Sequence, residues 1–81
     1  MIQSNQELFK AADGFILRLK KAGDNNWAGR IHDALRTSTL PGEILGELRF
    51  QLREIAKTPI IGKTQSEREV KEMLDYIGTV I

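Results

Sequence analysis

The sequence contains no cysteine and only one histidine, and these two shortages exclude several kinds of chemistry. Without cysteine there can be no disulfide, no thiolate ligand for zinc and no cysteine nucleophile. His32 alone makes no zinc site, because carboxylates without further imidazoles or thiolates are a poor zinc set. On a helix the adjacent Asp33 points about 100° away from His32, so it does not serve as an orienting acid. We therefore predict no catalytic residue, no metal site and no cofactor, and we do not expect an enzyme.

The chain also lacks an excess of charge of one sign and any long apolar run. Twelve basic side chains stand against eleven acidic ones, and both signs are mixed in each half of the sequence. Such a balance does not draw a protein to nucleic acid or to an anionic membrane. The longest apolar run, Phe15 to Leu17, is far too short to cross a membrane. The first seven residues lack the basic start and apolar stretch of a signal peptide, and we expect a cytoplasmic protein.

Hydrophobic residues make up 41% of the 81 residues, which is enough for one small core and one domain, residues 1–81. Apolar side chains recur at helical spacing in four segments. The fold class that we predict is all-α, a compact four-helix bundle with short loops, because each apolar stripe must be buried against another. The predicted helices are residues 5–22, 26–36, 41–57 and 67–77.

Capping residues mark the predicted helix boundaries. Ser4 with Glu7, and Ser66 with Glu69, have the spacing of a capping box at the start of a helix. Asp24-Asn25-Asn26 offers three candidate N-caps for the second helix, and Ser38 and Thr39 precede Pro41 at the start of the third. We expect glycines to end the first and last helices, at Gly23 and Gly78. Residues 58–65 are predicted to be a loop, and residues 79–81 a short apolar tail.

Phe50 does not fit the apolar stripe of its helix. At 100° per residue it lies roughly 160° from the centre of the stripe formed by Ile44, Leu45, Leu48, Leu52 and Ile55. Either the Ile60-Ile61 loop or the Val80-Ile81 tail folds back over Phe50, or Phe50 is an exposed anchor for a partner or a second protomer. The first hypothesis is therefore a non-enzymatic interaction or accessory protein whose partner is another protein or a second copy. The candidate partner-binding residues are Phe50, Ile60, Ile61, Val80 and Ile81.

A second hypothesis is a small regulator that associates with nucleic acid. Its candidate contacts are the basic residues Arg18, Lys20, Lys21, Arg30 and Arg36. The second and third predicted helices could also be interpreted as a helix-turn-helix pair. However, Glu43 and Glu47 would then lie in the leading turns of the recognition helix, where they would repel phosphates. We therefore favour a protein partner and predict no small-molecule ligand.

Between Leu19 and Ala56 the chain resembles a group of small bacterial proteins. The resemblance rests on Ala-Gly-Asp-Asn-Asn-Trp-Ala at residues 22–28, Ala-Leu-Arg-Thr-Ser-Thr at 34–39 and Gly-Glu-Ile-Leu-Gly-Glu-Leu-Arg at 42–49. These proteins are stand-alone helical domains of unknown function. The resemblance implies a bacterial, cytoplasmic, helical accessory protein and assigns no functional residue.

Overall fold

The computed structural model describes residues 1–81 and is helical throughout, with no strand. Four longer helices correspond to the four predicted ones, and a single extra turn lies between the last two. The helices are α1 (Asn5–Lys21), α2 (Asn25–Ala34), α3 (Pro41–Ile55), α4 (Ile60–Lys63) and α5 (Glu67–Val80). The molecule is compact, with extents of 30 × 23 × 20 Å.

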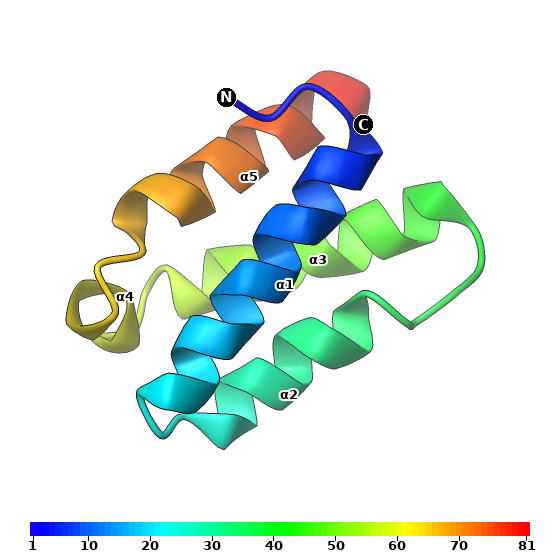
Figure 1. Ribbon diagram of the computed structural model, residues 1–81. Helices are drawn as coiled ribbons and strands as arrows, with labels where there is room; N and C mark the ends of the chain where they lie inside the picture. The colour runs from blue at the N-terminus through cyan, green and yellow to red at the C-terminus, as the bar shows by residue number, and fades with distance from the viewer.

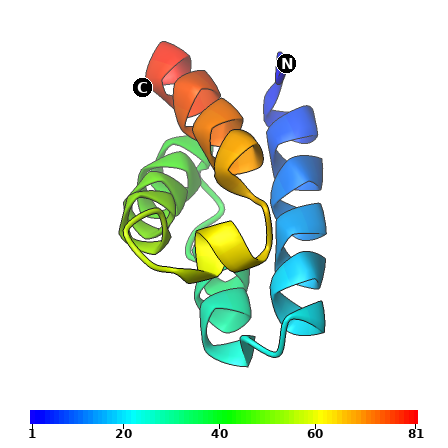
Figure 2. The same cartoon turned by 90° about the vertical axis from the view of Figure 1, so that its left-hand side faces the viewer.

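The four longer helices enclose one core. Helices α1 and α3 lie on opposite sides of the molecule, and α2 and α5 each pack against both of them (Figures 1 and 2). The helices cross one another instead of running side by side, and α4 forms a turn between the ends of α3 and α5. Sixteen apolar residues are buried in a single cluster. They are Leu8, Ala12, Phe15, Ile16, Leu19, Ala28, Ile31, Ala34, Leu45, Leu48, Leu52, Ile55, Ile61, Val70, Met73 and Ile77.

Several predicted boundaries are confirmed by their hydrogen bonds. The Ser4 hydroxyl accepts a hydrogen bond from the Glu7 amide at 3.1 Å, and the Glu7 carboxylate accepts one from the Gln3 amide at 2.7 Å. Asp24 is the N-cap of α2, where its carboxylate accepts a hydrogen bond from the Trp27 amide at 2.9 Å. Gly23 follows α1 with φ of +82°, which is the left-handed conformation expected of a glycine that ends a helix.

The region after α3 differs from the prediction. Residues 60–63 form the helical turn α4 instead of a loop, and Ile61 enters the core. Ser66 is the N-cap residue of α5, but its side chain accepts no capping hydrogen bond, and its buried hydroxyl points to Thr64 and donates to the Thr64 hydroxyl at 2.7 Å. Gly78 does not end α5, which continues to Val80. The last residues are therefore a helix end and not an extended tail.

At the start of α3, Leu40 is the N-cap and Pro41 the first helical residue, whereas neither Ser38 nor Thr39 provides a side-chain cap. The Ser38 hydroxyl instead accepts a hydrogen bond from the Leu40 amide at 3.0 Å, which closes a turn just before the helix. Pro41 has no amide hydrogen to satisfy in this first turn, so the helix tolerates the missing side-chain cap.

Two polar contacts connect α1 to α5 outside the core. Arg18 and Glu69 form an ion pair of 2.9 Å, and both side chains are more than a third exposed. Near the chain ends, the Tyr76 hydroxyl donates a hydrogen bond to the Asn5 side-chain oxygen at 2.6 Å. These contacts fix the relative position of two helices that lie at opposite ends of the sequence.

Candidate interaction surface on helix α3

Helix α3 presents one face to the core and leaves the other free. Leu45, Leu48, Leu52 and Ile55 are buried, as the apolar stripe predicts. Phe50 lies on the opposite face with an exposed fraction of 54%. A phenylalanine that is half exposed leaves an aromatic ring in contact with water, which is typical of a residue that anchors a partner.

The two segments that were candidates to cover Phe50 do not bury it. Ile61 is 7% exposed and packs in the core, so it is removed from the candidate partner-binding residues. Ile60 is half-buried and packs against the same core. The two residues lie in a helical turn because burial of the Ile61 side chain outweighs the extended preference of a β-branched pair. Val80 and Ile81 remain exposed, at 46% and 49%.

Charged side chains surround Phe50 on the exposed face of α3. Glu43 and Glu47 precede it, whereas Arg53 and Lys57 follow it. Lys57, two residues past the end of α3, pairs with Glu54 of that helix at 3.1 Å, and Glu47 accepts a hydrogen bond from Gln51 at 3.1 Å. Glu43 and Arg53 take part in none of the ion pairs of the structure. An apolar anchor within a ring of charge has the composition of a small protein interface.

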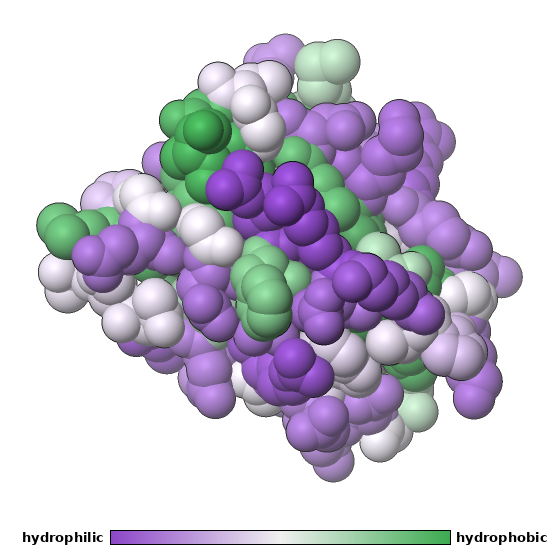
Figure 3. Space-filling view, turned by 180° about the vertical axis from the view of Figure 1, so that it is seen from behind, coloured by the Kyte–Doolittle hydropathy of each residue, from purple (hydrophilic) through white to green (hydrophobic).

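Three other large apolar side chains are exposed, and the sequence analysis did not single them out. Met1 is 98% exposed, Leu17 on α1 is 59% exposed and Leu40 before α3 is 58% exposed. Leu17 could have been found by the reasoning applied to Phe50, because it also lies opposite the apolar stripe of its helix. Seen from the α3 side, the apolar surface is divided into patches that hydrophilic side chains separate (Figure 3).

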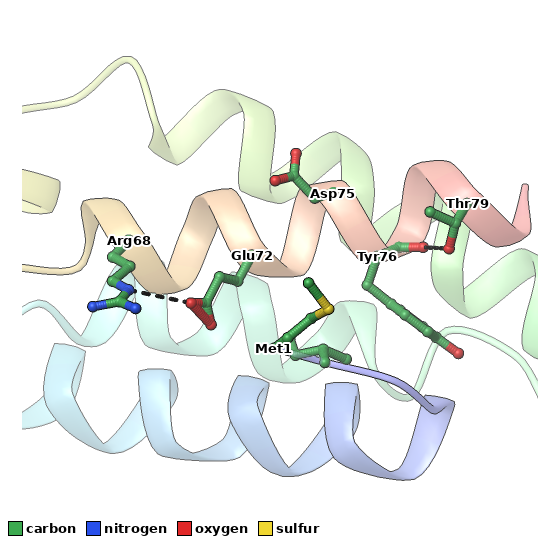
Figure 4. A pocket seen from close by; sticks show the side chains of 7 residues that line it. Met1, Arg68, Glu72, Asp75, Tyr76 and Thr79 are labelled. Carbon is green, nitrogen blue, oxygen red and sulfur yellow. Dashed lines mark hydrogen bonds and ion pairs between the residues drawn. The ribbon is translucent and has the colours of Figure 1, made fainter.

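The largest hollow of the surface lies between the first residues and α5 (Figure 4). It has a volume of about 360 Å³ and is lined by Met1, Ile2, Arg68, Glu72, Asp75, Tyr76 and Thr79. Its polar groups are engaged with one another: Arg68 pairs with Glu72 at 3.3 Å, and the Thr79 hydroxyl donates to the Tyr76 carbonyl at 2.7 Å. This hollow was not predicted, and its polar side chains do not converge on a common point.

The side chains that could take part in catalysis or metal binding, His32 and the carboxylates, do not gather at one site. The His32 ring nitrogen Nδ1 lies 3.4 Å from the Asp33 carboxylate, so the two side chains are closer than the separation of about 100° on the helix predicted. The Arg36 guanidinium donates to the His32 backbone carbonyl at 3.5 Å. No three histidine, aspartate or glutamate side chains group together where they could hold a metal ion. No helix has the length and apolar character needed to cross a membrane.

The five basic residues of the nucleic-acid hypothesis are spread over α1, α2 and the turn after α2. Arg18 is paired with Glu69, and Arg30 stacks over the Trp27 ring at 3.9 Å from its centre. Lys20 and Lys21 are exposed at the end of α1. Trp27 itself is partly buried against the core.

Comparison of the chain with protein-family models, with curated proteins and with solved structures gives no match.

Proposed function

We propose that this protein is a non-enzymatic interaction or accessory protein, and that it binds a protein partner through an apolar surface centred on Phe50. The observation that carries the proposal is the 54% exposure of Phe50 on the free face of α3, among charged neighbours. Aromatic side chains that are enclosed by polar residues supply most of the binding energy in many interfaces. Val80 and Ile81, both about half exposed at the end of α5, remain further candidate partner-binding residues. In the same proposal the four longer helices form one four-helix bundle in a small cytoplasmic domain. The packing of each longer helix against two others around one core supports this arrangement.

Site-specific photo-crosslinking tests the partner surface. A photoreactive phenylalanine analogue at position 50 is expected to form a covalent adduct with a protein, either a partner or a second copy, in the cells that make the protein. The same analogue at position 17 is the matched control, because Leu17 has a comparable exposed fraction, 59%, and belongs to α1, which lies across the core from α3. Equal yields at the two positions, or no adduct at position 50, would contradict the proposal.

The nucleic-acid alternative predicts a different dependence on salt. Phosphate contacts release counterions, so binding through Lys20, Lys21 and the three arginines would weaken steeply as salt rises. All three arginines make contacts within the chain: Arg18 with Glu69, Arg30 with the Trp27 ring and Arg36, at 3.5 Å, with the His32 carbonyl. A titration of labelled single- and double-stranded oligonucleotides at low and physiological salt separates the two proposals. Strong low-salt binding that Lys20→Glu and Lys21→Glu abolish would favour nucleic acid.

A further inference from the structure

The charges on the free face of α3 are arranged symmetrically about Phe50. Glu47 lies three residues before Phe50 and Arg53 three residues after it. Glu43 lies seven residues before and Lys57 seven residues after. Steps of three and seven keep side chains on one face of a helix, which places Glu43, Glu47 and Arg53 on the Phe50 side. Lys57 lies two positions past Ile55, the last residue of α3, and its 3.1 Å ion pair holds it beside Glu54, which lies one turn after Phe50 on the same face. The face is therefore acidic toward the start of α3, whereas toward its end Arg53 and Lys57 outnumber Glu54 and leave a net positive charge.

Such a pattern is complementary to itself when two copies of the helix run antiparallel. A two-fold axis through Phe50 brings each residue opposite the one that is equally far along the other side of Phe50. Glu47 then faces Arg53 of the partner subunit, and Glu43 faces Lys57 of the partner subunit. The symmetry repeats both pairs, so four oppositely charged pairs would flank two aromatic rings. A parallel pairing would instead bring glutamate against glutamate and cation against cation.

We propose that the occupant of this surface is a second copy of the chain, with α3 packed antiparallel on α3 and the two Phe50 rings at the two-fold axis. The inference rests on the proposed function, and it specifies the partner and the geometry. Gly46 supports the close approach, because it lies one turn before Phe50 on the same face and a side chain built there meets only open space. The Phe50 ring, which leans toward the start of its helix, therefore has an open neighbour.

The corresponding face of α1 carries a weaker pattern. Leu17 is exposed there, and Asp13 and Lys21 lie four residues to either side of it with opposite charges. However, α1 ends at Lys21, so the helix supports only this one pair. In α3 nine helical residues precede Phe50 and five follow it, and Lys57 lies two positions past the helix end, so the chain around Phe50 carries two such pairs.

The size of the surface sets the expected strength of association. Fifteen helical residues extend over about 22 Å, so one face of α3 makes a small interface compared with the roughly 800 Å² that each partner buries in a standard complex. We therefore expect a dimer that dissociates in the micromolar range or above. Sedimentation equilibrium and light scattering from low micromolar to several hundred micromolar protein should show conversion of monomer to dimer.

The first test removes the anchor. Phe50→Asp is expected to weaken dimerisation by more than about 30-fold, the factor that corresponds to loss of a central aromatic hot spot. Leu17→Asp is the matched control and should dimerise like the native chain. Circular dichroism of each variant confirms that it is folded. A native chain that stays monomeric at every concentration, or a dimer that survives Phe50→Asp and not Leu17→Asp, would overturn the inference.

The second test uses charge reversal to establish the geometry. One variant carries Glu43→Lys and Glu47→Arg, and Glu54 is then the single acidic residue on a free face that is otherwise basic. The other carries Arg53→Glu and Lys57→Glu, and its free face is wholly acidic. Each should lose self-association by on the order of tenfold or more, because symmetry places like charges opposite one another in four pairs. An equimolar mixture should form a heterodimer, because the antiparallel pairing then joins opposite charges throughout.

A third variant separates this geometry from simple attraction between oppositely charged proteins. Lys20→Glu with Lys63→Glu has the same net charge as the acidic variant, but both changes lie outside α3. It should dimerise with itself like the native chain and should not pair with the basic variant. Association that depends on Phe50 but ignores the charge reversals would refute the antiparallel α3 dimer and leave the proposed function standing. If the native chain stays monomeric and the analogue at position 50 crosslinks only to a different protein, the antiparallel dimer is also refuted and the proposed function still stands.

Discussion

Phe15 and Phe50 are the same residue type in two long helices, and the structure predicts opposite consequences when each is replaced by alanine. Phe15 is fully buried in the core, whereas Phe50 is 54% exposed. Phe15→Ala removes a side chain that neighbours surround on all sides, and such truncations cost about 3–5 kcal/mol. The free energy of unfolding for a domain of this length is roughly 4–12 kcal/mol, so Phe15→Ala should leave the chain marginally folded or unfolded.

The magnitude for Phe50→Ala follows from its partial burial. Full burial of a phenylalanine side chain stabilises a fold by about 1.5–3 kcal/mol, and roughly half of that applies to Phe50. Alanine is also a better helix former than phenylalanine by about 0.5 kcal/mol at an exposed position. The two effects oppose each other, so the variant should lose about 1 kcal/mol or less.

Urea unfolding followed by circular dichroism measures both changes. The unfolding should be measured at the lowest workable protein concentration, because a dimer has then dissociated and only the stability of the single chain is measured. A loss of more than about 2 kcal/mol for Phe50→Ala at that concentration would refute the reasoning. It would mean that the ring is packed within its own chain, and then the surface centred on Phe50 would not be free for a partner.

Three further variants test local features of the fold by the same unfolding measurement. Gly14→Ala should raise stability by up to about 1 kcal/mol, because Gly14 is an exposed helical residue and an added Cβ meets nothing within 4 Å. Gly23→Ala should lower stability by about 1–2 kcal/mol, because φ at this position is +82°. Tyr76→Phe removes the 2.6 Å hydrogen bond to Asn5, and a loss of about 0.5–1.5 kcal/mol is expected. Three results would contradict this reasoning: a Gly14→Ala variant that is less stable than the native chain, a Gly23→Ala variant of unchanged stability, or a Tyr76→Phe variant with an unchanged urea midpoint.

The longer helices could be predicted because local patterns determine them. The apolar stripes, the Ser4 and Asp24 caps and the glycine at position 23 depend on residues within a few positions of one another. The errors occur where a distant contact decides the structure. Ile61 lies in a helical turn because the core accepts its side chain, and the short segment around it carries no helical repeat that would show this. No local rule predicts that burial would turn the Ser66 hydroxyl away from its helix.

Helix-wheel geometry identifies which face of a helix carries an unusual residue, but it does not say what lies beyond that face. It placed Phe50 opposite its stripe, and the structure adds that neither Ile60 and Ile61 nor the end of α5 buries it. The same geometry applied to Leu17 gives a second exposed side chain of comparable area. What distinguishes the two is the number of charged pairs around them. Phe50 has two pairs of oppositely charged residues at equal distances along the chain, whereas Leu17 has only Asp13 and Lys21, the last residue of α1. Two such pairs around an anchor specify the direction of a partner helix more strongly than one pair does, and Phe50 is the exposed anchor that has two.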